Sequence, residues 1–216
     1  NSIRPYYRFF KKDLPFNKDE IKKIKSKHKR KFIDRVDYIA ASYREEFESV
    51  TKLIGEKKKW LEFWYFPLEF MVDINNKSLE IKENIIIGNS GNPTNNHIDI
   101  IEKIKNYKVF SVNEIIFPLS YGDDQHIKSV KNSIDLDLPD KGYAMTNFLS
   151  LDEYIKIIEN CNVYINNARR QQAVGTIVPI IWFGAKVFLS NRNSFYHYLK
   201  RIGVEVSCYE TDLNEK

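Results

Sequence analysis

From residue 84 onward, short apolar runs alternate along the chain with amphipathic stretches. The apolar runs are rich in β-branched residues and predict strands at 83–90, 113–120, 142–148, 162–167, 185–190 and 204–207. Apolar residues at helical spacing predict helices between them, at 93–107, 123–134, 151–161, 173–184 and 193–203. Short buried strands separated by such helices indicate a parallel sheet with helices on both faces. The pattern therefore predicts a Rossmann-like, doubly wound α/β domain over residues 81–216.

The first 80 residues have a different pattern. They predict a strand at 32–42, a helix at 43–55 that ends at Gly55, and an aromatic-rich strand at 59–70. The polar stretch 74–83 is predicted to be a linker. These elements are too few to close a doubly wound sheet of their own. We therefore interpret residues 1–80 as the C-terminal part of a second α/β domain with its linker.

Composition supports a folded protein, and its longest apolar stretch does not predict a membrane span. The 216 residues carry a formal charge of +5, and 43% of them are hydrophobic. The two cysteines make no disulfide framework and suggest a reducing compartment. The longest apolar stretch, 173–189, contains Pro179 and Lys186 and is too interrupted to cross a bilayer. No signal peptide is visible, and the start at Asn1 leads us to expect a fragment of a longer protein.

The excess of positive charge is concentrated in IKKIKSKHKRKF (21–32). A solvated helix would explain this stretch, and so would attraction to an anionic membrane surface. Binding to nucleic acid is disfavoured, because no aromatic residues are interleaved with the basic ones.

A dense polar stretch, GNSGNPTNN (88–96), directly follows the first predicted strand of the doubly wound domain. Ligands of open parallel sheets bind beyond the carboxyl ends of the strands. We expect Asn92 to cap the next helix and Pro93 to take its first position. The preceding residues would then offer N–H groups and short polar side chains to phosphate or sugar hydroxyls: Gly88, Asn89, Ser90 and Gly91. A plain, well-capped turn is the alternative, because the stretch is neither GxGxxG nor a Walker A sequence.

Two further polar loops follow predicted strands of the same sheet. In PLSYGDD (118–124), Ser120 and Tyr121 are expected to line the cleft, and Asp123 or Asp124 to cap a helix. In INNARRQQAVGTI (165–177), two arginines offer planar donors that match phosphate oxygens. Gly175 would let the backbone approach an anion at the helix N-terminus, whereas solvated arginines are the alternative.

Metal and nucleophile motifs are missing from the sequence. No His or Cys pair has the spacing of metal ligands, and no GxSxG or Ser/His/Asp order occurs. His97 and His126 are expected near the first turns of helices beside the cleft, where a structural or capping role is favoured over a catalytic one.

At GNSGNPTNNH (88–97), PLSYG (118–122) and RRQQAVGTI (169–177), the sequence resembles one enzyme family. It is similar to the 4-acetamido-4,6-dideoxygalactose (Fuc4NAc) transferases of enterobacterial common antigen synthesis. These are TDP-N-acetylfucosamine:lipid II N-acetylfucosaminyltransferases, inverting enzymes with a GT-B fold. The resemblance covers roughly residues 35–206. It implies two Rossmann-like domains that face each other across a cleft, with residues 1–80 at the end of the acceptor-side domain.

The resemblance also implies where the nucleotide-sugar binds. The C-terminal domain would hold a dTDP-sugar as substrate, with no cofactor and no metal. The diphosphate would contact Arg169, Arg170 and the amides near Gly175. The other implied donor-binding residues are Asn89, Ser90, Gly91, Asn92, Asn95, His97, Ser120, Tyr121 and Gln171.

The implied acceptor is a polyprenyl-diphosphate-linked saccharide. This implies a cytoplasmic protein, peripheral on the inner face of the bacterial cytoplasmic membrane, with no nucleic-acid partner. The basic stretch 21–32 would then lie near anionic lipid.

Two departures from the family pattern affect this interpretation. The helix at 173–184 has no acidic residue to bind ribose, so other groups must contact the nucleoside. An inverting enzyme also needs a general base, which we expect in the N-terminal domain and assign to no residue. The alternatives are transfer of another nucleotide-sugar in capsule or O-antigen synthesis and a non-catalytic nucleotide-sugar-binding domain. A Rossmann oxidoreductase is disfavoured, because the dinucleotide fingerprint is missing.

Overall fold

A computed structural model describes residues 22, 26–55, 58–64, 67–75, 82–107 and 112–214. The chain forms two compact units. The first unit comprises the described residues of Asn1–Phe66, Arg169–Gln171 and Asn191–Val204. The second unit comprises the described residues of Pro67–Ala168, Gln172–Ser190 and Glu205–Lys216. The predicted boundary at residue 80 lies outside the described residues, as does most of the predicted linker.

The second unit is built on a six-stranded sheet in which every neighbouring pair is parallel. Its strands are β3 (Asn84–Ile87), β4 (Ile115–Pro118), β5 (Gly142–Met145), β6 (Cys161–Asn166), β7 (Lys186–Leu189) and β8 (Ser207–Cys208). Their order in the sheet is β5-β4-β3-β6-β7-β8. This is the doubly wound Rossmann order, and it confirms the predicted α/β fold class.

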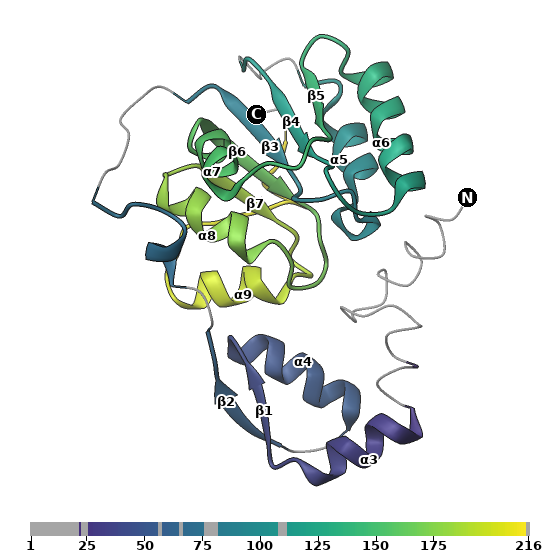
Figure 1. The fold of residues 1–216 in the computed structure, drawn as a ribbon, viewed down its shortest axis with the longest axis vertical. Helices are drawn as coiled ribbons and strands as arrows, with labels where there is room; N and C mark the ends of the chain where they lie inside the picture. Colours follow the sequence, from purple (N-terminus) through teal and green to yellow (C-terminus); the bar gives the residue numbers. More distant parts are fainter. Residues whose placement is uncertain are drawn as a thin grey trace. The chain divides into compact units, whose positions relative to one another are not determined.

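Helices connect these strands and cover the sheet (Figure 1). They are α5 (His97–Ile104), α6 (Asp124–Asp137), α7 (Leu151–Glu159) and α8 (Val174–Trp182), and a 3₁₀ turn, Pro93–Asn95, precedes α5. Helix α5 packs beside α6, and α7 packs beside α8. Because the chain reverses its direction across the sheet after β5, right-handed crossovers put these two pairs on opposite faces.

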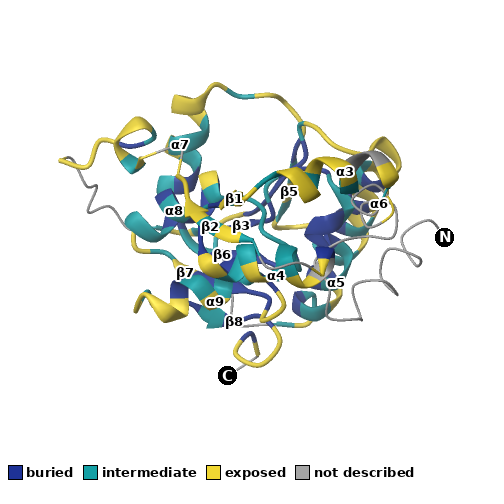
Figure 2. Cartoon of the chain, turned by 90° about the horizontal axis from the view of Figure 1, so that it is seen from below, coloured by how far each residue is buried: buried dark blue, intermediate teal, exposed yellow. Residues whose placement is uncertain are grey.

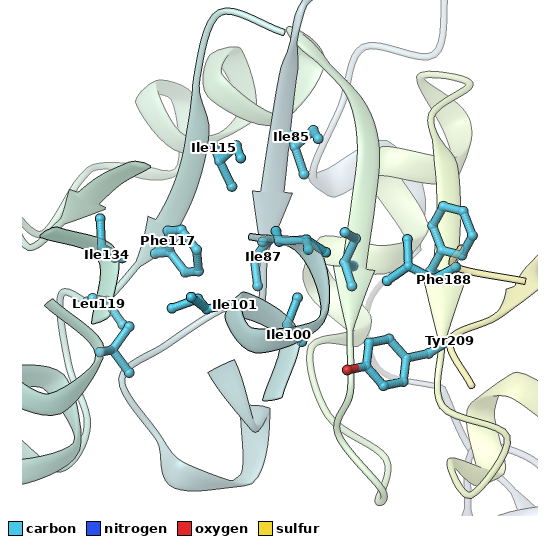
Figure 3. Close-up of a cluster of buried hydrophobic side chains, with 14 residues drawn as sticks. Ile85, Ile87, Ile100, Ile101, Ile115, Phe117, Leu119, Ile134, Phe188 and Tyr209 are labelled. Atoms are coloured by element: carbon cyan, nitrogen blue, oxygen red, sulfur yellow. The ribbon is translucent and has the colours of Figure 1, made fainter. Parts of the chain in front are cut away.

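The core of the second unit lies between the sheet and the α5–α6 pair (Figure 3). Ile85 and Ile87 of β3 share this core with Phe117 of β4, and all three side chains are fully buried. Ile86 is also fully buried, on the opposite face, because successive side chains of a strand alternate. Strand β3 is therefore buried on both sides (dark blue in Figure 2), which explains its uninterrupted run of isoleucines.

The first unit contains α3 (Lys27–Arg35), α4 (Arg44–Ile54), α9 (Ser194–Arg201) and a parallel pair of strands, β1 (Tyr38–Ala41) and β2 (Lys59–Glu62). Helix α4 ends before Gly55, as predicted. The strand predicted at 32–42 is wrong for residues 32–35, which continue α3 because Lys and Arg are good helix formers. The strand predicted at 59–70 stops at Glu62; after Pro67, which cannot donate to a ladder, a 3₁₀ turn forms at Leu68–Phe70.

Helix α9 groups with the first unit, although it lies between β7 and β8 in the chain. Tyr43, at the start of α4, is fully buried, and its ring stacks on Tyr198 of α9 with centroids 4.9 Å apart. The Tyr43 hydroxyl lies 3.1 Å from Ser194 Oγ. Arg201 Nε also donates to Glu45 Oε1 at 2.5 Å. Aromatic packing and this ion pair therefore hold α9 against α4.

Candidate functional site

The strand order defines one position where a ligand is expected. Strand β3 pairs with β4 on one side and with β6 on the other. From β3 the chain adds β4 and β5 on one side of the sheet, and it then crosses back to add β6 on the other side of β3. Such a switch point opens a crevice at the carboxyl ends of the two central strands. The loops that follow β3 (88–96), β4 (119–123) and β6 (167–173) all begin at this edge.

The β3 loop (88–96) is closed by its own side chains. Asn92 Oδ1 accepts the Thr94 N–H at 3.1 Å and caps the 3₁₀ turn, and Pro93 takes its first position. The predicted cap is therefore present, although it belongs to this turn and not to α5. Asn95 Nδ2 donates to Ser90 O at 2.8 Å. Ser90 and Asn95 are buried, whereas Asn89 and Asn92 are half-buried.

Two histidines meet beneath the β3 loop. His97 Nδ1 of α5 lies 3.1 Å from His126 Nε2 of α6, and both side chains are buried. Burial, with a smaller electrostatic contribution from His126, lowers the pKa of His97 to about 3. Burial also lowers the pKa of His126, against an opposing effect of Asp123. Both rings are therefore neutral at pH 7, with one N–H shared between them.

Gly88 is required where β3 ends. Its φ is 72°, and a Cβ there would lie 2.5 Å from His97 Nε2. A side chain would therefore be strained in backbone conformation and would collide with the buried imidazole. The His97 ring thus packs against a surface that only glycine provides.

The β4 loop (119–123) is attached to the β3 loop through its backbone. Gly91 N donates to Tyr121 O at 2.7 Å, and Asp123 N donates to Gly91 O at 3.1 Å. The Asp123 side chain caps α6 by accepting from His126 N at 2.7 Å, which confirms the predicted capping role. Ser120 is half-buried. The Tyr121 ring is 55% exposed at the edge where a ligand would lie.

The β6 loop (167–173) is attached to the β3 loop by side chains. Gln172 Nε2 lies 2.9 Å from Asn89 Oδ1, and Gln172 Oε1 lies 2.6 Å from Thr94 Oγ1. Asn96 Nδ2 donates to Asn167 O at 2.8 Å. Three loops that are far apart in the sequence are thus joined at one edge of the sheet.

Helix α8 begins at this edge with an unusual backbone conformation. Ala173, which precedes it, has a φ of 63°, a left-handed conformation that costs a residue with a side chain about 1–2 kcal/mol. Gly175 is exposed in the first turn, and the Tyr154 hydroxyl lies 3.0 Å from Thr176 Oγ1 in the same turn. The N-terminus of α8 therefore presents N–H groups and the positive end of the helix dipole, which suit an anion.

Most of the predicted site residues belong to the second unit, but three of them belong to the first. Arg169, Arg170 and Gln171 belong to the first unit, and all three are half-buried. Their predicted contact with a diphosphate stays a prediction.

Sequence reasoning missed two residues of the site. The resemblance implies a role for Gln171 but not for its neighbour Gln172, and the sequence does not predict that His126 contacts His97. No local pattern identifies either contact, because each joins loops from different strands.

Comparison with solved structures supports the fold. The chain is similar to the N-terminal domain of trehalose-6-phosphate phosphatase from Candida albicans, with 11% identity and a TM-score of 0.65 over 92% of this chain and 53% of that one. It is also similar to the pneumococcal O-GlcNAc transferase GtfA in complex with UDP and GlcNAc, with 14% identity and a TM-score of 0.58 over 88% of this chain and 37% of that one. The catalytic domain of cholesterol-α-glucosyltransferase from Helicobacter pylori matches with 18% identity and a TM-score of 0.45 over 61% and 80%. The chain thus spans about half of the first of these proteins and about a third of the second.

The doubly wound sheet, with its joined loops at the switch point, is that of a GT-B glycosyltransferase domain. Residues 26–216 match the model of the family described as 4-alpha-L-fucosyltransferase, glycosyl transferase group 56. The chain belongs to this family of glycosyltransferases.

Proposed function

We propose that this protein transfers Fuc4NAc from a dTDP-sugar to a polyprenyl-diphosphate-linked saccharide, with inversion and without a metal. One observation carries the proposal. In a chain of the 4-α-L-fucosyltransferase family, three polar loops are joined at the switch point of the doubly wound sheet. The choice of sugar, nucleotide and acceptor comes from the resemblance of these same loops to the Fuc4NAc transferases. The product would serve the synthesis of a bacterial surface polysaccharide such as enterobacterial common antigen.

The diphosphate of the donor is the part that this chain is best equipped to bind. The first turn of α8, with exposed Gly175, supplies N–H groups and a positive dipole end. In our proposal Arg169 and Arg170 add planar donors that match phosphate oxygens in pairs. These groups would neutralise the leaving diphosphate as charge develops on it, which is the task of a metal ion in other enzymes.

For the acceptor side, we propose a peripheral position at the inner face of the cytoplasmic membrane. Helix α3 carries Lys27, Lys31 and Arg35 as exposed cations, and Phe32 beside them is 67% exposed. Cations and an aromatic ring on one helix suit the surface of an anionic bilayer. Within the described parts of the chain, no helix is both long and apolar enough to cross a membrane.

Calorimetry with dTDP, UDP and GDP, each with and without EDTA, tests the donor site. We expect selective dTDP binding that EDTA leaves unchanged. Arg169→Ala and Arg170→Ala should each weaken it roughly tenfold or more, since a hydrogen bond to a charged group contributes about 1.5–3 kcal/mol. Arg35→Ala, which removes an exposed arginine of α3, is the matched control. Failure of dTDP to bind, or binding that EDTA abolishes, would contradict the proposal.

Transfer itself needs a second assay, with dTDP-Fuc4NAc and a polyprenyl-diphosphate disaccharide. Release of dTDP together with a larger lipid-linked product would identify the transferase. Tight dTDP binding without either product would favour a non-catalytic nucleotide-sugar-binding domain, and transfer from another nucleotide-sugar would favour capsule or O-antigen synthesis.

A further inference from the structure

Gln172 occupies a distinctive position between the β3 and β6 loops. Its side-chain amide touches Thr94 at one end and Asn89 at the other, at 2.6 Å and 2.9 Å. Thr94 is buried, and Asn89 and Gln172 are half-buried. The contacts form a chain that begins at Asn92 and ends at Asn89, so the proton placement at one end determines what the other end presents.

The first link of this chain is fixed by the backbone. The Thr94 N–H donates to Asn92 Oδ1 at 3.1 Å, so the Asn92 carbonyl oxygen faces Thr94. The Thr94 hydroxyl lies 2.8 Å from the same oxygen. Two oxygen atoms this close need a proton between them, and the Asn92 oxygen has none. The Thr94 hydroxyl therefore donates to Asn92 Oδ1.

The second link follows from counting protons. A hydroxyl has a single proton, so Thr94 Oγ1 can only accept from Gln172. With Gln172 Oε1 at 2.6 Å, no proton would separate these two oxygens. A half-turn of the terminal amide exchanges its oxygen and nitrogen without moving other atoms. Gln172 Nε2 then donates to Thr94, and Gln172 Oε1 faces Asn89.

The third link determines the polarity of Asn89, that is, whether its side-chain amide donates to Gln172 or accepts from it. With a carbonyl oxygen of Gln172 facing it, Asn89 must donate through its own Nδ2, which turns its carbonyl oxygen outward. Asn89 is half-buried at the edge where the donor would lie, so its side chain is partly accessible to a ligand. An outward carbonyl accepts a hydrogen bond from a hydroxyl or an N–H, and it repels a phosphate oxygen.

We propose that Gln172 is a positioning residue that holds the Asn89 carbonyl oxygen toward the donor sugar. Asn89 then reads a hydroxyl or amide N–H of that sugar and contributes nothing to the diphosphate. This inference rests on the proposed function for the identity of the ligand. The opposite polarity would make Asn89 a donor to phosphate, so one amide rotation decides which part of the substrate is recognised.

The polarity can be measured without any ligand. In an isotope-labelled sample, NMR couplings across hydrogen bonds link a donor nitrogen to the carbonyl carbon of its acceptor. We expect a coupling between Asn89 Nδ2 and the Gln172 side-chain carbonyl carbon. A coupling between Gln172 Nε2 and the Asn89 side-chain carbonyl carbon would overturn the inference.

The role in recognition is tested by the ratio of two dissociation constants, that of dTDP over that of dTDP-Fuc4NAc. Gln172→Ala should lower this ratio about fivefold, as expected for one lost hydrogen bond. Gln125→Ala, on an exposed part of α6, is the matched control.

The outcomes separate this inference from the proposed function. An unchanged ratio in Gln172→Ala, or an equal loss for both ligands, would show that Gln172 is merely structural and would overturn the inference. If the wild-type protein bound neither ligand, the proposed function would fail, and the NMR coupling would still decide the polarity of Asn89.

Discussion

The buried pair His97–His126 predicts that this protein loses stability in mild acid. Both rings are neutral in the folded state, and their facing nitrogens are 3.1 Å apart. Burial lowers the pKa of His97 to about 3, whereas an unfolded histidine has a pKa of about 6.5. The unfolded state therefore binds the proton first as the pH falls. The stabilisation is fully present above pH 6.5 and is lost progressively between pH 6.5 and pH 3.

The expected loss follows from the two pKa values. A pH of 5 lies about 1.5 units below the pKa of an unfolded histidine. Each unit corresponds to about 1.4 kcal/mol in the free energy of unfolding, so His97 alone contributes a loss of about 2 kcal/mol at this pH. The pKa of His126 is also lowered, chiefly by burial, so its contribution has the same sign. A loss of this size is a large fraction of the stability of an ordinary domain.

The assay is urea denaturation at several pH values between 7 and 5, followed by circular dichroism. His97→Gln keeps a hydrogen-bonding side chain but cannot be protonated, so it should be less stable at pH 7 and should lose less on acidification. His197→Gln, which removes an exposed histidine, is the matched control and should keep the acid loss. A free energy of unfolding that stays constant from pH 7 to pH 5, or an equal loss in His97→Gln, would refute the reasoning.

Two further predictions concern other parts of the molecule. At Gly122, where φ is 143°, a Cβ would lie 2.3 Å from the Gly91 carbonyl carbon, so Gly122→Ala should cost about 3 kcal/mol or more in urea denaturation. Gly184→Ala, also at positive φ but with open space around it, should cost only about 1–2 kcal/mol, and equal losses would contradict the close contact. Replacing the α3 cations Lys27, Lys31 and Arg35 by Gln should weaken sedimentation with anionic vesicles about fivefold per cation. The same change at the exposed Lys128, Lys131 and Lys141 should have little effect, and equal losses would argue against a role of α3.

Much of the second unit could be predicted because its signals are local. The run Ile85–Ile87 predicts a strand buried on both faces. Asp123 caps helix α6 after β4, and Asn92 caps the 3₁₀ turn after β3. The first unit was harder to predict. Basic residues at 27–35 favour a helix as much as the β-branched residues near them favour a strand, and α3 extends farther than expected. The N-terminal polar stretch 21–25 lies outside the described residues, apart from Lys22.

The sequence by itself determined the fold class, the approximate positions of the strands and helices, and three loops on one sheet edge. Each of these depends on the order of apolar and polar residues within a few positions of one another. Only the tertiary structure decided that His97 faces His126, that Gln172 joins Asn89 to Thr94, and that Tyr43 holds α9 in the first unit. The physical reason is that these contacts join segments from different strands and helices. Their geometry exists only after the sheet has brought those segments together.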